Sequence, residues 1–435
     1  MKKAISLLLT ALMLLCLFSC SDKKVGNETT AAIIKTDEKQ TDYSADVNEE
    51  KDFDIGIETA NLAFRILKKN LDTPNAVISP ISIATALTVV GGGAKGKTLE
   101  EISDFFGCNI SEIQNGIERY VKETNSDSKL GITLANSVWF NGQNGRLTIN
   151  SDYEKMCTER FGAEVFKDNF HTSNTARKIN LWISEKTDKR INNVIENVSK
   201  EAVAYVINSV LFESEWQTNY LANDCIPNST FTTESGKKQT VTMLKSAETV
   251  NDALNFRLGK TEVVCKSYKN GYSFAGILPD EGVSLKKALD SFSGKDFVKA
   301  VTNPLIDENG EKLYGIHCVN LLLPKFEFKC SFKLSDTLKS MGIKKAFDSD
   351  ADFSGMAVSS MGNIYINEVY HNTYIRFSEN GTEAAASTVV EMFDECAKSQ
   401  PANTREIIFD RPFIYVIFSP EGIPVFVGTV TDFEA

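Results

Sequence analysis

The chain has 435 residues, a hydrophobic content of 42%, a charged content of 24% and a net charge of −11. These values are typical of a globular protein that buries a large core, and the length allows two or three domains or a single large one. Surfaces that bind nucleic acids are basic, so the acidic balance predicts no nucleic-acid partner.

The N-terminal segment is typical of an export signal. Two lysines precede residues 4–18, a run that is apolar except for Ser6 and Thr10. The run is shorter than the roughly 20 apolar residues that span a membrane, and a charged start before a short apolar run marks a signal peptide. The polar residues that follow, 21–51, predict a flexible tether.

Nine cysteines are present, two of which, Cys16 and Cys20, lie in the predicted signal. The remaining seven are Cys108, Cys157, Cys225, Cys265, Cys318, Cys330 and Cys396. They show no paired spacing and no CxxC, so we predict neither a disulfide framework nor a zinc site. Most are expected to be small buried side chains, with Cys396 as the exposed exception.

Helices dominate the first part of the chain. Apolar residues at helical spacing, start signals and glycine stops predict helices over 53–70, from Pro80 to Gly91, from near Thr98, from near Ser111 and over 176–187. Residues 132–141 and 203–212 are predicted to be strands between them.

From Val241 onward the pattern is mostly that of strands, with helices near Leu285 and Leu334. A long strand is predicted over 363–377, and a hairpin of 413–418 and 425–431 closes the chain. No internal repeat is present. Helices first and antiparallel strands later predict a single α+β domain.

Residues 379–396, ENGTEAAASTVVEMFDEC, alternate like a strand that has one buried face. One set of alternate positions is small or apolar throughout: Thr382, Ala384, Ala386, Thr388, Val390 and Met392. The charges from Glu383 to Glu391 fall on the other face. Yet the segment runs into a polar, loop-like stretch at 398–405, which suggests two conformations for one segment. From this segment alone, an Ala-rich helix or a tethered linker is an equal alternative.

No catalytic motif is found. The three histidines, His171, His317 and His371, belong to no HExxH, and no GxSxG or phosphate-binding glycine loop occurs. The glycines at 91–93 end a helix instead of beginning one, which favours a helix stop over a phosphate site. We therefore predict no enzyme, no metal and no cofactor.

Taken together, the segments from residue 53 to the C-terminus resemble the serpin family. The resemblance is carried by seven or more pieces in family order: NAVISPISI at 75–83, 134–140, INLWISEKTDKRI at 179–191, INSVLFESEW at 207–216, LPKFEF at 323–328, ADFSGM at 351–356, RPFI at 411–414 and FVG at 426–428. Each piece alone is weakly specific, whereas their order makes a chance match very unlikely.

The resemblance implies a serpin domain over 52–435, with three β-sheets, about nine helices and an exposed reactive loop at about 379–407. In inhibitory serpins, a protease cuts this loop and forms an acyl-enzyme, and the cut loop then inserts into the main sheet, a known case of strand addition that releases stored strain. The implied function is suicide-substrate inhibition of serine, and also cysteine, proteases by a monomer. A serpin-fold binding protein without inhibition is the alternative.

The hinge of the loop is chemically suited to insertion. By the resemblance it comprises Glu379, Gly381, Thr382, Glu383, Ala384, Ala385, Ala386, Ser387 and Thr388. An inserted strand must not carry charge into the core, and its inward positions here are uncharged. Gly381 supplies backbone freedom and the alanines lose little side-chain entropy, so inhibition is favoured over the binding-protein alternative.

Other matched positions have family roles in opening the main sheet. Ser79, Ser82, Asn208 and His371 match the polar cluster beneath the sheet, the shutter, which favours a hydrogen-bonded role over catalysis for His371. Trp216 matches the tryptophan of the breach, where insertion begins, and Lys325 with Glu379 matches a common ion pair at the hinge base. Simple core packing is the alternative for all of these residues.

Family spacing, with Gly381 as the fifteenth residue before the cut, places the reactive bond at Glu395–Cys396. The stretch from there to Pro412 is longer than the family norm, so Phe393 and Lys398 are alternative sites. An acidic Glu395 suits proteases with a basic specificity pocket. Cys396 is then either a spectator or a thiol open to oxidation.

Residues 17–20, LFSC, resemble the cleavage motif of bacterial lipoproteins, in which the cysteine, here Cys20, carries the lipid. This predicts an exported protein that contacts the membrane only through its N-terminal lipid. Because Phe18 is bulkier than the residue usual at its position, plain secretion is the alternative.

Overall fold

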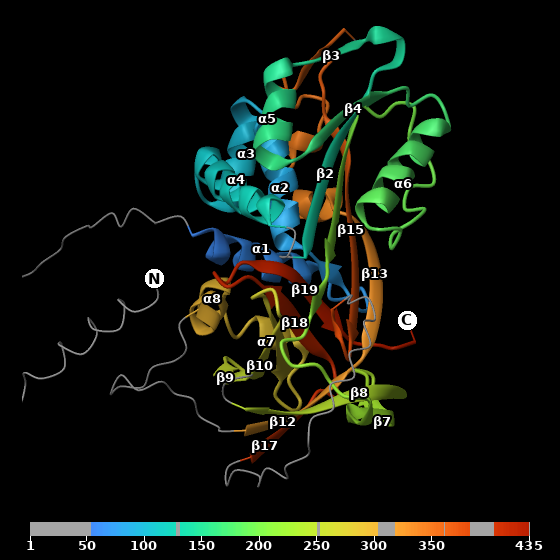
Figure 1. Cartoon of the computed structure of the whole chain (residues 1–435). Coiled ribbons are helices and arrows are strands. Elements are labelled where there is room, and N and C mark those ends of the chain that lie inside the picture. Colours follow the sequence, from blue (N-terminus) through green and yellow to red (C-terminus); the bar gives the residue numbers. More distant parts are fainter. Residues whose placement is uncertain are drawn as a thin grey trace, which may run out of the picture. The chain divides into compact units, whose positions relative to one another are not determined.

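The computed structural model describes residues 54–127, 131–249, 253–302, 318–360, 362–382 and 404–434. All of them lie in one compact unit, Asp52–Ala435. Within this described part, the chain forms nine α-helices and three large β-sheets, the α+β fold that the sequence predicts (Figure 1). In chain order the helices are α1 (Ile55–Lys69), α2 (Pro80–Gly91), α3 (Gly96–Phe106), α4 (Ile110–Ser126), α5 (Ser151–Phe161), α6 (Asn174–Lys186), α7 (Leu285–Leu289), α8 (Gly294–Thr302) and α9 (Ser335–Ser340).

The largest sheet has seven strands and is called the main sheet below. Its order is β4 (Glu164–Asp168), β2 (Ile132–Asn141), β5 (Ala204–Phe212), β15 (Ile366–Ser378), β16 (Gly381–Thr382) and β6 (Ser214–Glu215), with β13 (Phe326–Lys333) also paired to β15. Strand β5 is antiparallel to β2 but parallel to β15. The parallel pair β5–β15 is the seam that a new strand would have to part.

The other sheets complete the fold. A six-stranded sheet runs β1 (Val77–Ile78), β19 (Pro424–Val430), β18 (Phe413–Phe418), β11 (Ser273–Pro279), β10 (Thr261–Ser267) and β9 (Ala253–Leu258). A four-stranded sheet runs β17 (Thr404–Ile408), β12 (Cys318–Pro324), β8 (Lys238–Thr249) and β7 (Cys225–Thr232), and β14 (Ala357–Ser359) pairs with β3 (Leu147–Ile149).

Helices cover both faces of the main sheet. Figure 1 shows α2 and α6 on opposite sides of the long strands β2 and β15. Alternate residues of β5 divide accordingly: Val206 packs into the core that contains α2, and Ile207 into the core that contains α6. This alternation is expected of a strand buried on both faces.

Helix α2 lies in the core along its whole length. Every residue from Pro80 to Gly91 is buried, which explains why apolar residues lie on all sides of the helix and why it carries no charged side chain. Pro80 occupies the first helical position, where its missing N–H costs nothing. A Cβ on Gly93 would lie 2.2 Å from the Met356 side chain, so close packing of the loop after the helix requires glycine.

The predicted elements agree closely with the structure. The helices predicted over 53–70 and 176–187 correspond to α1 and α6 within two residues at each end, and the glycine stop after Pro80 ends α2 as expected. The strand predicted over 363–377 begins later, at Ile366 in β15. None of the helices in the described residues is long and apolar enough to cross a membrane.

Candidate functional site

The start of the predicted hinge is already part of the main sheet. Strand β16 pairs on one side with β15, through Phe377↔Thr382, and on the other side with β6, through Thr382↔Ser214. Lower in the sheet, β15 pairs directly with β5 as far as Thr373↔Val210. The seam is therefore parted at one end, where two hinge residues lie between β15 and β6, the strand that directly follows β5, and it is closed where β15 pairs with β5.

Gly381 is required at this position for two reasons. Its φ of +146° is a conformation that only glycine adopts readily. A Cβ there would also lie 2.1 Å from the carbonyl oxygen of Ser214. Beyond the backbone freedom expected of a hinge glycine, the structure shows that Gly381 lies in close contact with the backbone of the neighbouring strand.

Trp216 and its neighbours hold the main chain of the hinge. The Trp216 backbone N–H donates to Asn380 O at 3.1 Å, and its indole Nε1–H donates to Ser378 O at 2.9 Å. The Tyr220 N–H donates to Glu379 O at 3.1 Å. The Trp216 ring is fully buried and stacks on Tyr268 at a centroid distance of 4.3 Å. The structure thus places the predicted breach tryptophan directly against the hinge.

The predicted ion pair at the hinge base is present, with Lys325 Nζ 2.5 Å from Glu379 Oε2. Partial burial is the largest single influence on Glu379 and opposes its ionisation. The hydrogen bond and charge of Lys325, a hydrogen bond from its own backbone N–H and the charge of Arg376 together outweigh burial and hold the pKa of the carboxyl below its ordinary value. Both side chains are about one-third exposed (34% each), so solvent screens the pair and its contribution to stability is modest.

The four predicted shutter residues come together beneath the closed part of the seam. Asn208 on β5 and His371 on β15 are register partners, and their side chains are joined through Asn208 Oδ1 and His371 Nδ1. Asn208 Nδ2 donates to Ser82 O at 2.9 Å, and the Ser79 N–H donates to His371 Nε2 at 2.9 Å. All four residues are fully buried, so the cluster ties both seam strands to α2.

These contacts determine the protonation of His371. Its Nε2 accepts from a backbone N–H, so the proton of the neutral ring lies on Nδ1, from which it donates to Asn208. Burial lowers the pKa of His371 to about 3. The ring is neutral at pH 7, and a second proton would face the Ser79 N–H.

Two residues important to these contacts were missed by sequence reasoning. Asn136 on β2 accepts from Asn208 at 2.6 Å, and Tyr268 contacts Thr382. An Asn in the middle of the strand predicted over 132–141 was a usable signal for the first. Nothing in the local pattern around Tyr268 distinguishes it from a core tyrosine.

The cluster is not fully satisfied. Among the described residues, Ser79 Oγ and Asn136 Nδ2 are buried side-chain atoms without a hydrogen-bond partner. Unpaired buried polar groups are costly, and here two of them flank the Asn208–His371 bond. The closed shutter therefore retains unused hydrogen-bonding capacity.

Most of the predicted reactive loop lies outside the described residues. This applies to hinge residues Glu383, Ala384, Ala385, Ala386, Ser387 and Thr388, to the reactive-bond candidates Phe393, Glu395, Cys396 and Lys398, and also to Cys20 and His317. The loop's last residues by our boundary, 404–407, lie in β17, which pairs with β12. His171 is exposed. Among the cysteines whose burial is described, Cys157 and Cys265 are buried, whereas Cys108, Cys225 and Cys330 are partly buried.

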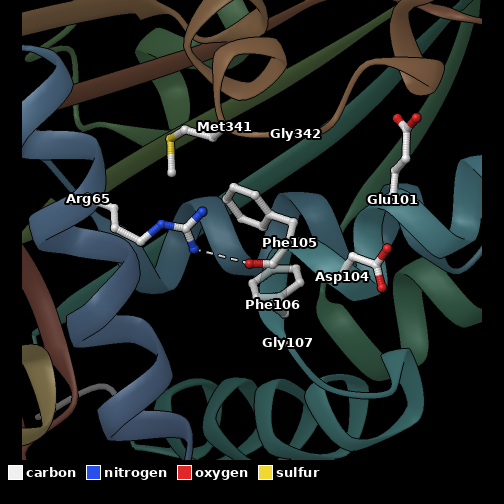
Figure 2. A pocket seen from close by; sticks show the side chains of 8 residues that line it. All are labelled: Arg65, Glu101, Asp104, Phe105, Phe106, Gly107, Met341 and Gly342. Atoms are coloured by element: carbon white, nitrogen blue, oxygen red, sulfur yellow. Dashed lines mark hydrogen bonds between the residues drawn. The ribbon is translucent and has the colours of Figure 1, made fainter.

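A pocket of about 410 Å³ lies apart from these residues, between α1, α3 and the turn after α9 (Figure 2). Its polar groups serve the fold: Arg65 Nη1 donates to Phe105 O at 3.1 Å, and Glu101 accepts from the backbone N–H groups of Lys344 and Lys345. No group of His, Cys, Asp and Glu in the described residues could hold a metal ion.

Comparison with known proteins agrees with this arrangement. Residues 58–433 match the family model described as "Serpin (serine protease inhibitor)". A serine protease inhibitor of the rat, Rattus norvegicus, is 29% identical over 377 residues, covering 83% of this chain and 84% of its own. An uncharacterized serpin-like protein of Thermococcus kodakarensis is 30% identical over 361 residues, covering 81% of this chain and 80% of its own.

The chain therefore belongs to the serpin family and has the serpin fold. This is a family of protease inhibitors, and the chain is not an enzyme.

Solved structures define the fold further. The native state of tengpin, a thermophilic serpin, is similar with a TM-score of 0.78 and 32% identity over 88% of this chain and 96% of that one. Its latent state is similar with a TM-score of 0.71, at 29% identity over 88% and 99%. Human thyroxine-binding globulin complexed with its hormone has the same fold, with a TM-score of 0.74 at 22% identity over 87% and 98%.

Proposed function

We propose that the protein inhibits serine, and also cysteine, endopeptidases as a suicide substrate. The protease nucleophile attacks the carbonyl carbon of the reactive bond, the amine of the C-terminal part leaves, and an acyl-enzyme forms. Strand β16 then extends down the seam between β5 and β15. The protease stays attached through the ester or thioester and is carried along before water can release it.

The observation that carries this proposal is the register of β16. Thr382 lies opposite Phe377 on β15 and opposite Ser214 on β6. Continuing both registers by six residues places Thr388 opposite His371 on one side and Asn208 on the other. These two residues are already partners across the closed seam. Two separate strand registers thus lead to the same point.

The shutter supports the same path. Parting β5 from β15 breaks the bond between Asn208 and His371, which would leave both side chains without that partner. An inserted Thr388 brings a hydroxyl to this position, where Ser79 Oγ and Asn136 Nδ2 also lack partners. A hydroxyl both donates and accepts, so it suits a cluster that contains donors and acceptors.

The side chains of the hinge favour trapping over simple cleavage. Thr382 is 1% exposed and faces the core, so alternation carries Ala384, Ala386 and Thr388 to the same face. Glu383 falls on the opposite face. The strand therefore brings no charge inward as it advances.

Two finer assignments follow from the sequence alone. Spacing from Gly381 places the reactive bond at Glu395–Cys396, with Phe393 and Lys398 as the other candidate positions. The lipoprotein-like segment at 17–20 assigns the protein to a bacterial membrane or cell surface, anchored through lipid on Cys20. Cys20→Ser should abolish labelling with a radioactive fatty acid, and continued labelling would contradict the anchor.

The test is to incubate the protein with proteases of acidic, basic and aromatic specificity. A complex that survives boiling in detergent, together with mass spectrometry of the released C-terminal peptide, would support trapping and identify the cut bond. Clean cleavage without a complex would instead favour the serpin-fold binding protein. Thermal unfolding of the cleaved product shows whether its loop has inserted.

A further inference from the structure

Tyr268 lies beneath the entry of the seam and is held rigidly there. It follows β10 and forms an isolated β-bridge with Trp216. Its ring is 1% exposed, stacks on Trp216 with an interplanar angle of 13°, and meets Phe212 edge-on at 5.2 Å. Its backbone N–H donates to Tyr272 O at 2.8 Å. With both ring and backbone fixed, the position of the hydroxyl is also fixed.

That hydroxyl contacts the hinge. Tyr268 Oη lies 2.6 Å from Thr382 Oγ1, and both groups are buried. Burial raises the pKa of Tyr268 well above its ordinary value, so the phenol keeps its proton and can donate. This contact joins two side-chain hydroxyls, whereas Trp216 and Tyr220 donate to backbone carbonyls of the hinge.

We infer that Tyr268 sets the register of the inserting strand by selecting the side chain of Thr382. This inference rests on the proposed function and extends it by naming a positioning residue. The Tyr268 hydroxyl contacts the side chain of a particular hinge residue, whereas the Trp216 indole donates to a main-chain carbonyl. Main-chain hydrogen bonds can form equally well in a shifted register, so they do not select one.

Beyond Gly381 and Thr382, little in the hinge sequence fixes the register of the strand. Residues 384–386 are three alanines, which present nearly identical side chains to the sheet in neighbouring registers. A slip by one residue turns Glu383 toward the core, and a slip by two replaces Thr382 with Ala384. In either shifted register the residue opposite Tyr268, Glu383 or Ala384, has no hydroxyl for it to contact. The next hydroxyl on the inward face of the hinge is that of Thr388.

An incorrect register slows trapping in a specific way. A one-residue slip brings the Glu383 carboxylate into an apolar layer, which must be reversed before the strand can advance. During this delay water hydrolyses the acyl-enzyme and the protease escapes. The register contact should therefore control the partition between trapping and escape, while the rate of first cleavage depends on the exposed loop.

The experiment compares Tyr268→Phe with Tyr272→Phe. Tyr272 is the matched control because it is also buried and its hydroxyl lies 3.2 Å from that of Tyr120, not from the hinge. We expect Tyr268→Phe to raise the number of inhibitor molecules consumed per trapped protease about fivefold, the effect of one lost buried hydrogen bond, and Tyr272→Phe to leave it unchanged. The rate of loop cleavage should be the same in both variants.

Variants of Thr382 identify the contact itself. Thr382→Ser keeps the hydroxyl and should trap like the wild type, whereas Thr382→Val should match Tyr268→Phe. The double variant Tyr268→Phe/Thr382→Val should be no worse than either single one, because both remove the same bond. Effects that multiply in the double variant, or a Tyr268→Phe protein that partitions like the wild type, would overturn the inference.

A second readout does not depend on trapping. The loop can be nicked with a nonspecific protease and the gain in melting temperature measured for each variant. A smaller gain for Tyr268→Phe than for Tyr272→Phe supports the register role, and equal gains contradict it. If the wild type gains stability on nicking but traps no protease, the proposed function fails while the register inference is still decided by this comparison.

Discussion

The two ends of the seam between β5 and β15 differ in their strand pairing and in how well their polar groups are hydrogen-bonded. At the breach, β16 lies between β15 and β6, and Trp216 and Tyr220 satisfy the hinge carbonyls. At the shutter, β5 and β15 pair directly, and two buried polar atoms, Ser79 Oγ and Asn136 Nδ2, have no described partner. At the open end the backbone carbonyls of the hinge are hydrogen-bonded, whereas the closed end contains the two shutter atoms that have no described partner.

In the proposed mechanism, this difference gives strand insertion a direction. Each residue that follows Thr382 into the seam would exchange a direct β5–β15 contact for two new ladder contacts. The strand would reach the shutter at Thr388, where two buried polar side-chain atoms have no described partner. The breach guides the first residues, and the shutter opposes opening until the cut strand replaces its central bond. The following predictions test the two regions separately.

The largest effect is expected at the breach. Thr382→Arg would place an unpaired charge at a position that is 1% exposed and in contact with Tyr268, which costs several kcal/mol unless the hinge withdraws. The variant should be cleaved as a substrate, with the yield of detergent-stable complex falling more than about tenfold. Glu383→Arg is the control, because alternation places it on the outer face; equal trapping by Thr382→Arg and wild type would contradict insertion.

Acid should weaken the shutter. The pKa of His371 is about 3 in the folded protein, against an ordinary value of 6.5. Between these two pH values the imidazole is protonated in the unfolded chain but not in the folded one, so acid favours unfolding. The stabilisation is complete above pH 6.5 and is lost progressively as the pH falls toward 3, by about 4–5 kcal/mol at most.

Thermal unfolding between pH 7 and 4 measures this loss. His371→Gln removes the titrating group, so its melting temperature should fall less steeply with pH than that of the wild type. Parallel curves for the two proteins would show that His371 does not titrate in this window.

Two serines of the shutter, one preceding α2 and one within it, offer a matched pair. Ser79→Ala removes a buried hydroxyl that has no described partner and should raise the free energy of unfolding by about 1 kcal/mol. Ser82→Ala removes the acceptor of a bond from Asn208 and should lower it by about 1 kcal/mol. Denaturant unfolding of the uncut protein measures both, and effects of the same sign would contradict the assigned hydrogen bonds.

The smallest effect is expected at the hinge base. Replacing Lys325 with Met should cost no more than about 1 kcal/mol, because the ion pair with Glu379 is one-third exposed on each side. High salt should reduce the difference from wild type, which melting curves at low and high ionic strength would show. A large loss that salt does not affect would indicate that Lys325 acts through packing instead.

Much of the fold could be predicted from the sequence because the buried elements show the clearest pattern of apolar residues. Helix α2 and strand β15, both largely buried, were predictable from the spacing of their apolar residues and from stop signals such as the glycines that end α2. The seam itself was not, because the parallel pairing of β5 with β15 joins segments about 160 residues apart and leaves no local signature.

The candidate site divides in the same way. The resemblance identified Ser79, Ser82, Asn208, His371, Trp216 and Lys325, and the structure brings them to the seam. The resemblance did not indicate that Gly381 and Thr382 already form a strand. A two-residue ladder depends on the distance between the strands on either side and not on its own sequence. Tyr268 was missed for the same reason: its hydroxyl matters only because Thr382 lies beside it.

The most direct test of the account is the melting temperature of the uncut protein against that of the protein nicked within residues 383–403. Insertion adds a strand that pairs on both sides, so the nicked form should melt on the order of 10 °C or more above the uncut form. Equal melting temperatures would mean that the severed segment stays outside the sheet, and the proposed mechanism would be wrong.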